Sequence, residues 1–304
     1  MVKLKGKTAF VTGGASGLGF AIASEAASAG MNIIIADVRR AALDEALKSF
    51  KDNGVDAYGI ELNVTDREAY AKAAEEAVSK FGNIHLLCNN AGIGCTKGPL
   101  WEVTPADTDI AIDINLRGVL NGIQAIVPGM IKHGEGGHIV NTSSKNGLLP
   151  PATLGLYNLT KGAIVSLTET LAAELPEGYG ASVFCPGPFH TNLPNTSREI
   201  PALLLGGEVA PPNPPRQIDD EVDFNVENAQ KRMQQADAAG KLVIRGVRRG
   251  DLYIITHSEF YEGVKARYDA VLRAFPKDPP NEDFKRMMSF VTYNPVFAKQ
   301  RENG

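Results

Sequence analysis

The stretch Thr8-Ala-Phe-Val-Thr-Gly-Gly-Ala-Ser-Gly-Leu-Gly19 decides the fold of this 304-residue chain. Residues 8–12 predict a short buried strand, residues 13–19 a glycine-rich loop, and an alanine-rich helix follows to about Ala29. Glycine lets a ligand approach the backbone, and a helix N-terminus offers unpaired N–H groups and a positive dipole end to a pyrophosphate. A tight strand-to-helix turn without a ligand would use the same residues, so the loop alone leaves both interpretations open.

The next apolar run supports a nucleotide site. Residues 32–36, Asn-Ile-Ile-Ile-Ala, predict a second buried strand that ends at Asp37, eighteen residues beyond Gly19 (37 − 19 = 18). An acidic side chain there accepts hydrogen bonds from ribose hydroxyls and repels a 2′-phosphate, which favours NAD over NADP. The alternatives are a helix N-cap or loop aspartate, and Arg39 or Arg40 could attract a phosphate instead.

Strands and helices then alternate along the chain. The predicted elements are helix 39–52, strand 55–62, helix 66–81, strand 84–88, helix 105–132, strand 137–142, helix 155–175, strand 181–185, strand 252–255 and helix 259–274. Such alternation implies parallel βαβ units and a doubly wound sheet with helices on both faces, here as one domain over 1–304. Ligands of such sheets bind beyond the C-terminal ends of the strands.

A chemical pair lies on the helix 155–175, where Tyr157 and Lys161 are four residues apart. Positions i and i+4 share a helix face, so the phenol and the ammonium lie side by side. A nearby positive charge favours the phenolate, and a decrease of roughly 2–3 units in its pKa would make Tyr157 a usable general acid/base. The structural alternative is a solvated helix face.

Composition limits the possible partners and compartments. A hydrophobic content of 43% is enough for a sizeable core, and a net charge of −4 with a pI near 5.8 gives no general attraction to nucleic acid or acidic membranes. We expect no membrane span, since no apolar run approaches the length of one, and no targeting segment. Cys88, Cys95 and Cys185 are odd in number and widely spaced, which favours reduced thiols in a cytoplasmic protein over a zinc site. No metal site is predicted.

Six motifs follow one another over about residues 6–191: Thr12-Gly13…Gly17…Gly19, Asn89-Asn90-Ala91-Gly92, Asn115, Ser144, Tyr157 with Lys161, and Pro186-Gly187…Thr191. In these the chain resembles the single-domain short-chain dehydrogenase/reductase family. The resemblance implies a Rossmann-type parallel sheet of seven strands in the order 3-2-1-4-5-6-7, a nicotinamide cofactor, and a homodimer or homotetramer. Residues 251–267 are similar to a branch that includes bacterial aryl-ether Cα-dehydrogenases, which oxidise benzylic alcohols of lignin-derived aryl ethers.

The resemblance also implies roles for individual residues. Ser144 would polarise the substrate oxygen, Tyr157 would move the proton, Lys161 would lower the tyrosine pKa and bind ribose hydroxyls, and Asn115 would hold a water. Asn63 stands where the family more often has aspartate, and its carbonyl can still accept from the adenine amino group. The predicted cofactor contacts are Gly13, Ser16, Gly17, Leu18, Gly19, Asp37, Asn63, Val64, Asn90, Ala91, Gly92, Tyr157, Lys161, Pro186 and Thr191.

The substrate side is predicted from position near the nicotinamide. Candidate substrate contacts are Cys95, Leu149, Leu154, Phe189 and His190. The other histidines, His85, His133, His138 and His257, are expected at the surface or, for His257, at a helix start or interface.

The long segment 192–250 is predicted to be a lid over the substrate, and 275–304 a C-terminal tail. Residues 192–224 would be mobile without substrate, with the apolar run 200–205 facing Leu148, Leu149, Leu154, Phe189 and Leu193. The proline-rich residues 211–215 could instead be a plain linker.

Together these features predict an NAD(H)-dependent oxidoreductase that interconverts a secondary alcohol and a ketone, on a hydrophobic aromatic or alicyclic substrate. The intact set of Asn115, Ser144, Tyr157 and Lys161 favours catalysis, because a protein that only binds the cofactor has no use for a base. The alternatives are a non-catalytic NAD-binding sensor or scaffold, and an isomerase or dehydratase on the same fold.

Overall fold

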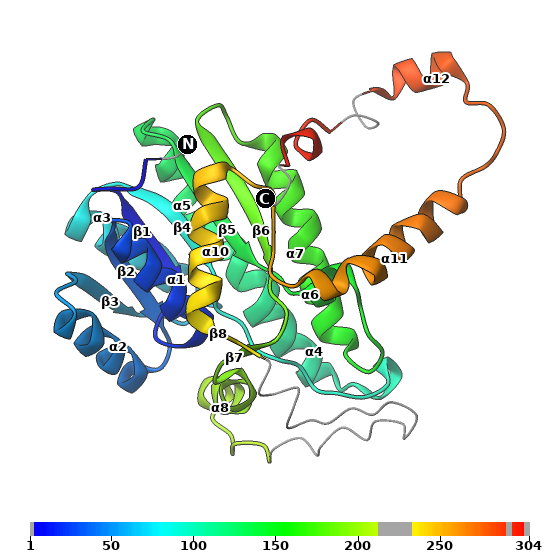
Figure 1. The fold of residues 1–304 in the computed structure, drawn as a ribbon. Helices are drawn as coiled ribbons and strands as arrows, with labels where there is room; N and C mark the ends of the chain where they lie inside the picture. Colours follow the sequence, from blue (N-terminus) through cyan, green and yellow to red (C-terminus); the bar gives the residue numbers. More distant parts are fainter. Residues whose placement is uncertain (1–2, 212–232, 290–293, 301–304) are drawn as a thin grey trace.

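Seven parallel strands form one sheet in the order β3-β2-β1-β4-β5-β6-β9, as the sequence predicts (Figure 1). The computed structural model describes residues 3–211, 233–289 and 294–300. The strands are β1 (Thr8–Thr12), β2 (Asn32–Asp37), β3 (Ala57–Glu61), β4 (Ile84–Asn89), β5 (Gly137–Thr142), β6 (Tyr179–Cys185) and β9 (Tyr253–Ile255). Two further strands that the sequence did not predict, β7 (Phe189–His190) and β8 (Gln234–Gln235), pair with each other.

Helices cover both faces of the sheet. One face carries α1 (Gly17–Ser28), α2 (Arg40–Asp52) and α10 (Ala236–Arg249), and the other carries α3 (Arg67–Phe81), α5 (Gly118–His133) and α7 (Gly155–Glu174). The remaining described α-helices are α4 (Pro105–Ile112), α6 (Lys145–Leu148), α8 (Leu193–Leu205), α11 (Tyr261–Arg273) and α12 (Glu282–Met287). This is the doubly wound Rossmann-type fold.

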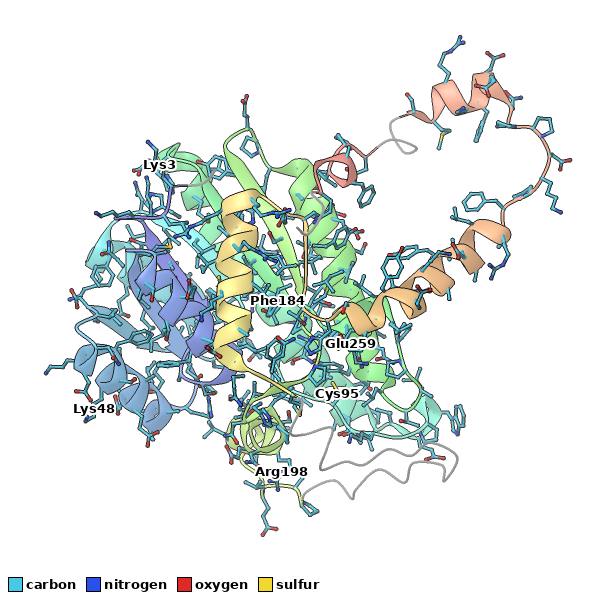
Figure 2. All side chains as sticks on the ribbon, in the orientation of Figure 1. Lys3, Lys48, Cys95, Phe184, Arg198 and Glu259 are labelled. Atoms are coloured by element: carbon cyan, nitrogen blue, oxygen red, sulfur yellow. The ribbon has the colours of Figure 1, made fainter. Side chains whose placement is uncertain are left out.

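Side-chain alternation along the strands explains the two layers. In β2, Ile33 and Ile35 pack under α1 and α2, while Ile34 packs under α3 on the opposite face. All three isoleucines are fully buried, and each buried side chain of this size contributes about 1.5–3 kcal/mol. Phe184 of β6, labelled in Figure 2, is buried in the cluster that α10 completes. Strands covered on both faces have continuous apolar sequences, which is the pattern of residues 33–36.

The single helix expected over 105–132 is interrupted. A π-helical turn at Asp113–Arg117 joins α4 to α5 and carries Asn115. By length and composition the whole run Pro105–His133 could cross a membrane, contrary to the expectation that no apolar run is long enough. Half of its most apolar window is buried inside the fold, as in the core helix of a layered domain.

The C-terminal part leaves the body and returns to it. In Figure 1, α11 extends away from α6 and α12 lies far from the sheet. Residues 294–300 return to the sheet edge, where Val296 is buried. There the Gln300 side chain accepts from the Tyr253 N–H at 2.8 Å and donates to the Tyr253 carbonyl at 3.5 Å, so it pairs with the edge strand β9.

The expectation that His85, His133 and His138 lie at the surface is wrong. His138 is 2% exposed and His85 is 9% exposed, while His133 is half-buried. His85 and His138 belong to β4 and β5, which are central strands covered on both faces, so even residues near a strand start are enclosed.

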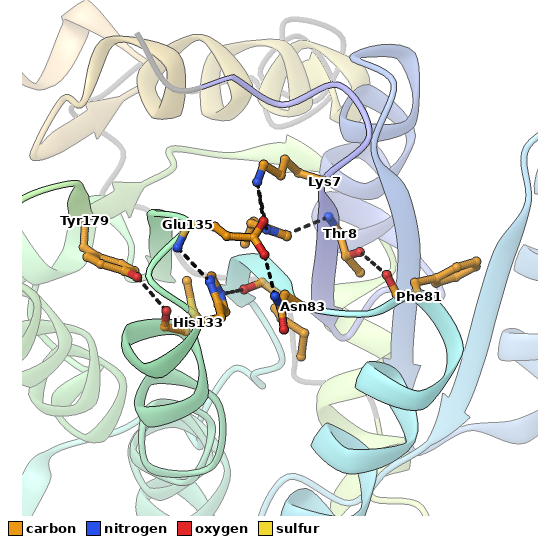
Figure 3. Close-up of polar contacts among 10 residues, drawn as sticks. Lys7, Thr8, Phe81, Asn83, His133, Glu135 and Tyr179 are labelled. Carbon is orange, nitrogen blue, oxygen red and sulfur yellow. Dashed lines mark hydrogen bonds and ion pairs between the residues drawn. The ribbon is translucent and has the colours of Figure 1, made fainter.

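His85 and His133 form a polar cluster with Lys7 and Glu135 (Figure 3). The Lys7 ammonium lies 2.7 Å from a Glu135 carboxylate oxygen and 3.1 Å from His85 Nε2. Both ring nitrogens of His133 bond to backbone, with Nε2 donating to the Ile84 carbonyl at 2.9 Å and Nδ1 accepting from the Glu135 N–H at 3.1 Å. The ligand atoms of His85, His133 and Glu135 are close enough to share a metal ion, but Lys7 already supplies the cation.

Candidate functional site

A cavity of about 340 Å³ opens at the carboxyl ends of the central strands. The glycine loop, the ends of β2 and β4, the start of α7 and the segment after β6 all contribute to its wall. Every predicted cofactor contact except Gly19 lines it: Gly13, Ser16, Gly17, Leu18, Asp37, Asn63, Val64, Asn90, Ala91, Gly92, Tyr157, Lys161, Pro186 and Thr191. The structure therefore brings one continuous set of predicted residues around one space.

The glycine loop has the geometry of a phosphate cradle. Gly13 and Gly17 have φ of 61° and 54°, in the left-handed region that favours glycine. Gly19 lies beneath the loop, where an added Cβ would stand 2.6 Å from Asn90 Nδ2. No side chain caps the N-terminus of α1, so its first N–H groups remain available beside the cavity.

Asp37 is not the free carboxylate that the sequence suggests. It is 5% exposed and paired with Arg39, whose Nε lies 3.1 Å from Oδ1 and whose Nη2 lies 3.2 Å from Oδ2. The same Nη2 donates to the Ser16 hydroxyl at 2.8 Å, so Arg39 bridges the glycine loop and the end of β2. A ribose at this end of the cavity would meet both the carboxylate and the guanidinium.

The Asn63 carbonyl is already occupied. Asn63 Oδ1 accepts from the Thr65 N–H at 3.1 Å and from the Thr65 hydroxyl at 2.9 Å. The predicted hydrogen bond from an adenine amino group to this oxygen would therefore compete with a local Asx turn. The sequence reasoning missed Thr65, although Asn-x-Thr is a common turn pattern.

Ser144, Tyr157 and Lys161 meet at the opposite end of the cavity. The Lys161 ammonium is 5.6 Å from the Tyr157 ring centroid and donates to the Thr142 carbonyl at 3.0 Å. Lys161 is 3% exposed, and burial lowers its pKa to about 8. The neighbouring Ser143 faces away from this group, since its hydroxyl donates to the Lys161 backbone carbonyl at 2.7 Å.

The expected decrease in the tyrosine pKa is not found in this state. Burial raises the pKa of Tyr157 above its ordinary value, and the hydrogen bond with the Ser144 hydroxyl opposes that rise. Burial also lowers the pKa of Lys161, so its ammonium loses its proton more readily than that of a free lysine. Within the described protein, Ser144 is thus the group that favours the phenolate.

Asn115 does not present a free amide to a water. It is fully buried, and it binds both backbone groups of Ile93: the Ile93 N–H donates to Oδ1 at 2.8 Å, and Nδ2 donates to the Ile93 carbonyl at 2.9 Å. An added Cβ on Gly92 would lie 3.1 Å from this Oδ1 and 3.4 Å from Lys161 Nζ. Asn115 therefore fixes the loop after β4 against Lys161, and the π-helical turn brings its side chain inward.

The predicted substrate wall is only partly right. Phe189 and Leu193 line the cavity, together with Ile200 and Leu204 of the predicted run 200–205. Leu148, Leu149, Leu154, Cys95 and His190 do not. This wall also includes Ile93, Pro188, Thr196 and Met233, which the sequence did not single out.

Four of the five residues that do not line the cavity have a clear location elsewhere in the structure. An added Cβ on Gly263 of α11 would lie 2.7 Å from Leu149, and Leu154 bridges through its backbone to Gly98. The Cys95 sulfur lies 3.7 Å from Asn115 Nδ2, behind that residue, and burial raises the pKa of its thiol to about 11. His190 faces a separate open hollow between α1 and α10.

One hydrogen bond ties α8 to the loop after β4. The Gly94 N–H donates to the Ser197 hydroxyl at 2.7 Å, and Ser197 donates to the Leu193 carbonyl at 2.6 Å. This places Ile200 and Leu204 over the cavity, whereas Leu203 and Leu205 on the other side of α8 are 57% and 67% exposed. The part of the predicted lid that spans 212–232 lies outside the described residues.

A parallel sheet with a glycine loop, an acidic residue after its second strand and a Ser–Tyr–Lys set at one cavity defines a Rossmann-type oxidoreductase. The chain belongs to the short chain dehydrogenase family, whose model matches residues 7–201.

Three relatives illustrate the range of this likeness. The C alpha-dehydrogenase of Sphingobium sp. strain SYK-6 is 35% identical over 275 residues, which cover 90% of this chain and 87% of that protein. A short chain dehydrogenase/reductase from Burkholderia phymatum, solved with NAD, matches with a TM-score of 0.78 and 32% identity over 92% of this chain and 100% of that one. A short chain dehydrogenase from Burkholderia cenocepacia J2315, solved with NADP, matches with a TM-score of 0.65 and 27% identity over 81% and 92% of the two chains.

Proposed function

We propose that this protein is an NAD-dependent dehydrogenase that interconverts a secondary alcohol and a ketone. One observation carries the proposal: Ser144, Tyr157 and Lys161 line one end of the cavity whose other end is lined by the glycine loop. The residues around the cavity fit a dinucleotide. The glycine loop and the uncapped N-terminus of α1 lie at one end, and the proton-transfer group Tyr157 lies at the other. When bound, a nicotinamide would accept or return the hydride.

The residues of the chain account for the proton and the charge. In alcohol oxidation the Tyr157 phenolate takes the proton from the substrate hydroxyl, while a hydride leaves the carbon that bears this hydroxyl. The alcohol thereby becomes a ketone. The Ser144 hydroxyl donates a hydrogen bond to the substrate oxygen as its charge changes. Lys161 lies beside the phenol and would bind ribose hydroxyls, which fixes the ring of the cofactor against the substrate.

The cofactor preference rests on Asp37. Its carboxylate is a poor neighbour for a 2′-phosphate, and its pairing with Arg39 neutralises the guanidinium that could attract one. The Burkholderia relatives bind NAD in one case and NADP in the other, so the preference of this chain is a proposal from its own residues.

The substrate class follows from the wall around Tyr157. Phe189, Leu193, Ile200 and Leu204 are apolar, which favours an aromatic or alicyclic alcohol over a sugar. The likeness to a C alpha-dehydrogenase supports an alcohol carbon attached to an aromatic ring.

A panel of aryl, alicyclic and polyol substrates, followed with NAD and NADP at about 340 nm, tests the proposal. We expect NADH formation with an aryl or alicyclic secondary alcohol. A sensor or scaffold would bind NAD without turnover, and an isomerase or dehydratase would convert substrate with no net change in absorbance. A clear preference for polyols would contradict the proposed substrate class. The cytoplasmic location, the homodimer or homotetramer and the absence of nucleic-acid or membrane partners stay predictions.

A further inference from the structure

Two asparagines connect the catalytic serine to the catalytic tyrosine without touching the cavity. Asn146 is two residues after Ser144, and Asn158 is the residue after Tyr157. Asn146 Nδ2 donates to Asn158 Oδ1 at 3.0 Å. Neither asparagine is among the residues that line the cavity, so we assign neither a contact with substrate or cofactor.

The chain between the two catalytic residues needs such a connection. Thirteen positions separate them (157 − 144 = 13), and they include the one-turn helix α6 and an irregular loop. Thr153 in that loop has φ of 64°, which is strained for a β-branched residue. Backbone geometry alone would hold the serine–tyrosine spacing poorly.

The orientation of the amides follows from their partners. Asn158 Nδ2 donates to the Pro151 carbonyl at 2.7 Å, and a carbonyl can only accept. Asn158 must therefore turn its oxygen toward Asn146, and Asn146 must present its NH₂ group. Asn146 is 4% exposed, so an unpaired amide there would be costly.

The same connection directs the serine hydroxyl. Ser144 caps α6, and its Oγ accepts from the Asn146 N–H at 3.2 Å. Because this bond occupies a lone pair, the hydroxyl hydrogen remains free to point to the Tyr157 oxygen or to a substrate oxygen. A shift of Asn146 would move both the cap and the hydroxyl.

We propose that Asn146 and Asn158 form an amide clamp that sets the distance between the Ser144 hydroxyl and the Tyr157 phenol. They are positioning residues for the proton transfer, and this role rests on the function proposed above. An error of about 1 Å in such a distance costs on the order of 100-fold in rate, so a loosened clamp affects turnover strongly.

The test uses Asn146→Ala, Asn158→Ala and the double variant in the full chain, with Asn53→Ala as control. Asn53 also donates its amide to a carbonyl, that of Ser49, but lies at the end of α2. We expect each clamp variant to lower kcat by about 10- to 100-fold with NAD affinity within a few-fold of the parent. The double variant should be about as slow as either single variant, because the two amides act as one unit.

A pH profile separates positioning from general damage. The Ser144 hydrogen bond lowers the pKa of Tyr157, so a loosened clamp shifts the midpoint of alcohol oxidation to higher pH. A ¹³Cζ tyrosine NMR signal, assigned by its loss in Tyr157→Phe, should move in the same variants without any turnover. The clamp is excluded if these variants keep the kcat of the parent, or if their pH midpoint and Tyr157 signal do not change. It is also excluded if they lose NAD binding. A parent that transfers no hydride would overturn the proposed function instead, while the NMR signal still decides the clamp.

Discussion

The Lys161 ammonium stands 5.6 Å from the centre of the Tyr157 ring and donates its hydrogen bond to the Thr142 carbonyl. The lysine is therefore anchored to the end of β5 and not to the phenol itself. Burial lowers the pKa of Lys161 to about 8, which leaves its ammonium mostly protonated near neutral pH, and it raises the pKa of Tyr157, so the phenol favours its neutral form here. A positively charged oxidised nicotinamide beside them would favour the phenolate.

Tyr157→Phe should reduce kcat for alcohol oxidation by at least about 100-fold, because it removes only the proton-transfer group. NAD affinity, measured by calorimetry, should stay within a few-fold. Lys161→Met should weaken both turnover and NAD binding, since the lysine has two roles. Activity of Tyr157→Phe within about tenfold of the parent would exclude the tyrosine as the acid/base.

Asp37→Ser should narrow the preference for NAD over NADP. The change removes a ribose acceptor and frees the Arg39 guanidinium, which now holds both carboxylate oxygens, to bind a 2′-phosphate. Relative kcat/KM for NADP and NAD measures the effect. Adding Arg39→Ala to Asp37→Ser should abolish the increase in relative kcat/KM for NADP. If the parent already prefers NADP, Arg39 determines the cofactor preference more strongly than Asp37 does.

Ser197→Ala should release α8 from the loop after β4, because the Gly94 N–H loses its acceptor. We expect KM for the alcohol to rise several-fold while NAD affinity stays unchanged, with faster amide exchange over residues 193–205. Thr108→Ala, which also removes a hydroxyl bonded to a helix carbonyl, is the matched control in α4. Equal exchange of 193–205 with and without a ketone inhibitor would argue against lid movement.

His138 should make the fold sensitive to acid. Burial lowers its pKa from 6.5 to about 4, so its contribution to stability is complete above pH 6.5 and is lost as the pH falls toward 4. The loss is on the order of 3 kcal/mol in the free energy of unfolding. His138→Gln keeps a hydrogen-bond partner for Ser182. In urea titrations of this variant, the free energy of unfolding should depend less on pH between about 4 and 6.5. Identical profiles for parent and variant would show that His138 titrates normally.

The fold predicted from the sequence is confirmed, and the predicted cofactor contacts other than Gly19 lie around one cavity, because both depend on local patterns. Residues 8–19 contain the whole strand–loop–helix unit, and the isoleucines of residues 33–35 predict a strand buried on both faces. Tyr157 and Lys161 are held together by helical spacing alone.

The substrate side was harder to predict because its residues lie in irregular segments. Leu149 and Leu154 flank a loop with no period, so nothing in the sequence tells which way their side chains point. Asn115 bonds to Ile93, 22 positions away, and such a long-range pairing leaves no local signal. Arg39 is close to Asp37 in sequence, yet their ion pair depends on the conformation of the turn between β2 and α2.

The pairing of Gln300 with Tyr253 has a consequence for solubility. An edge strand with free N–H and C=O groups is a template on which another chain can add a strand. One glutamine side chain satisfies both backbone groups of Tyr253 and so blocks that position of β9 against strand addition. The chain thus protects this edge of its sheet against edge-to-edge aggregation. The protecting residue lies almost three hundred positions after β1, the first strand of the sheet.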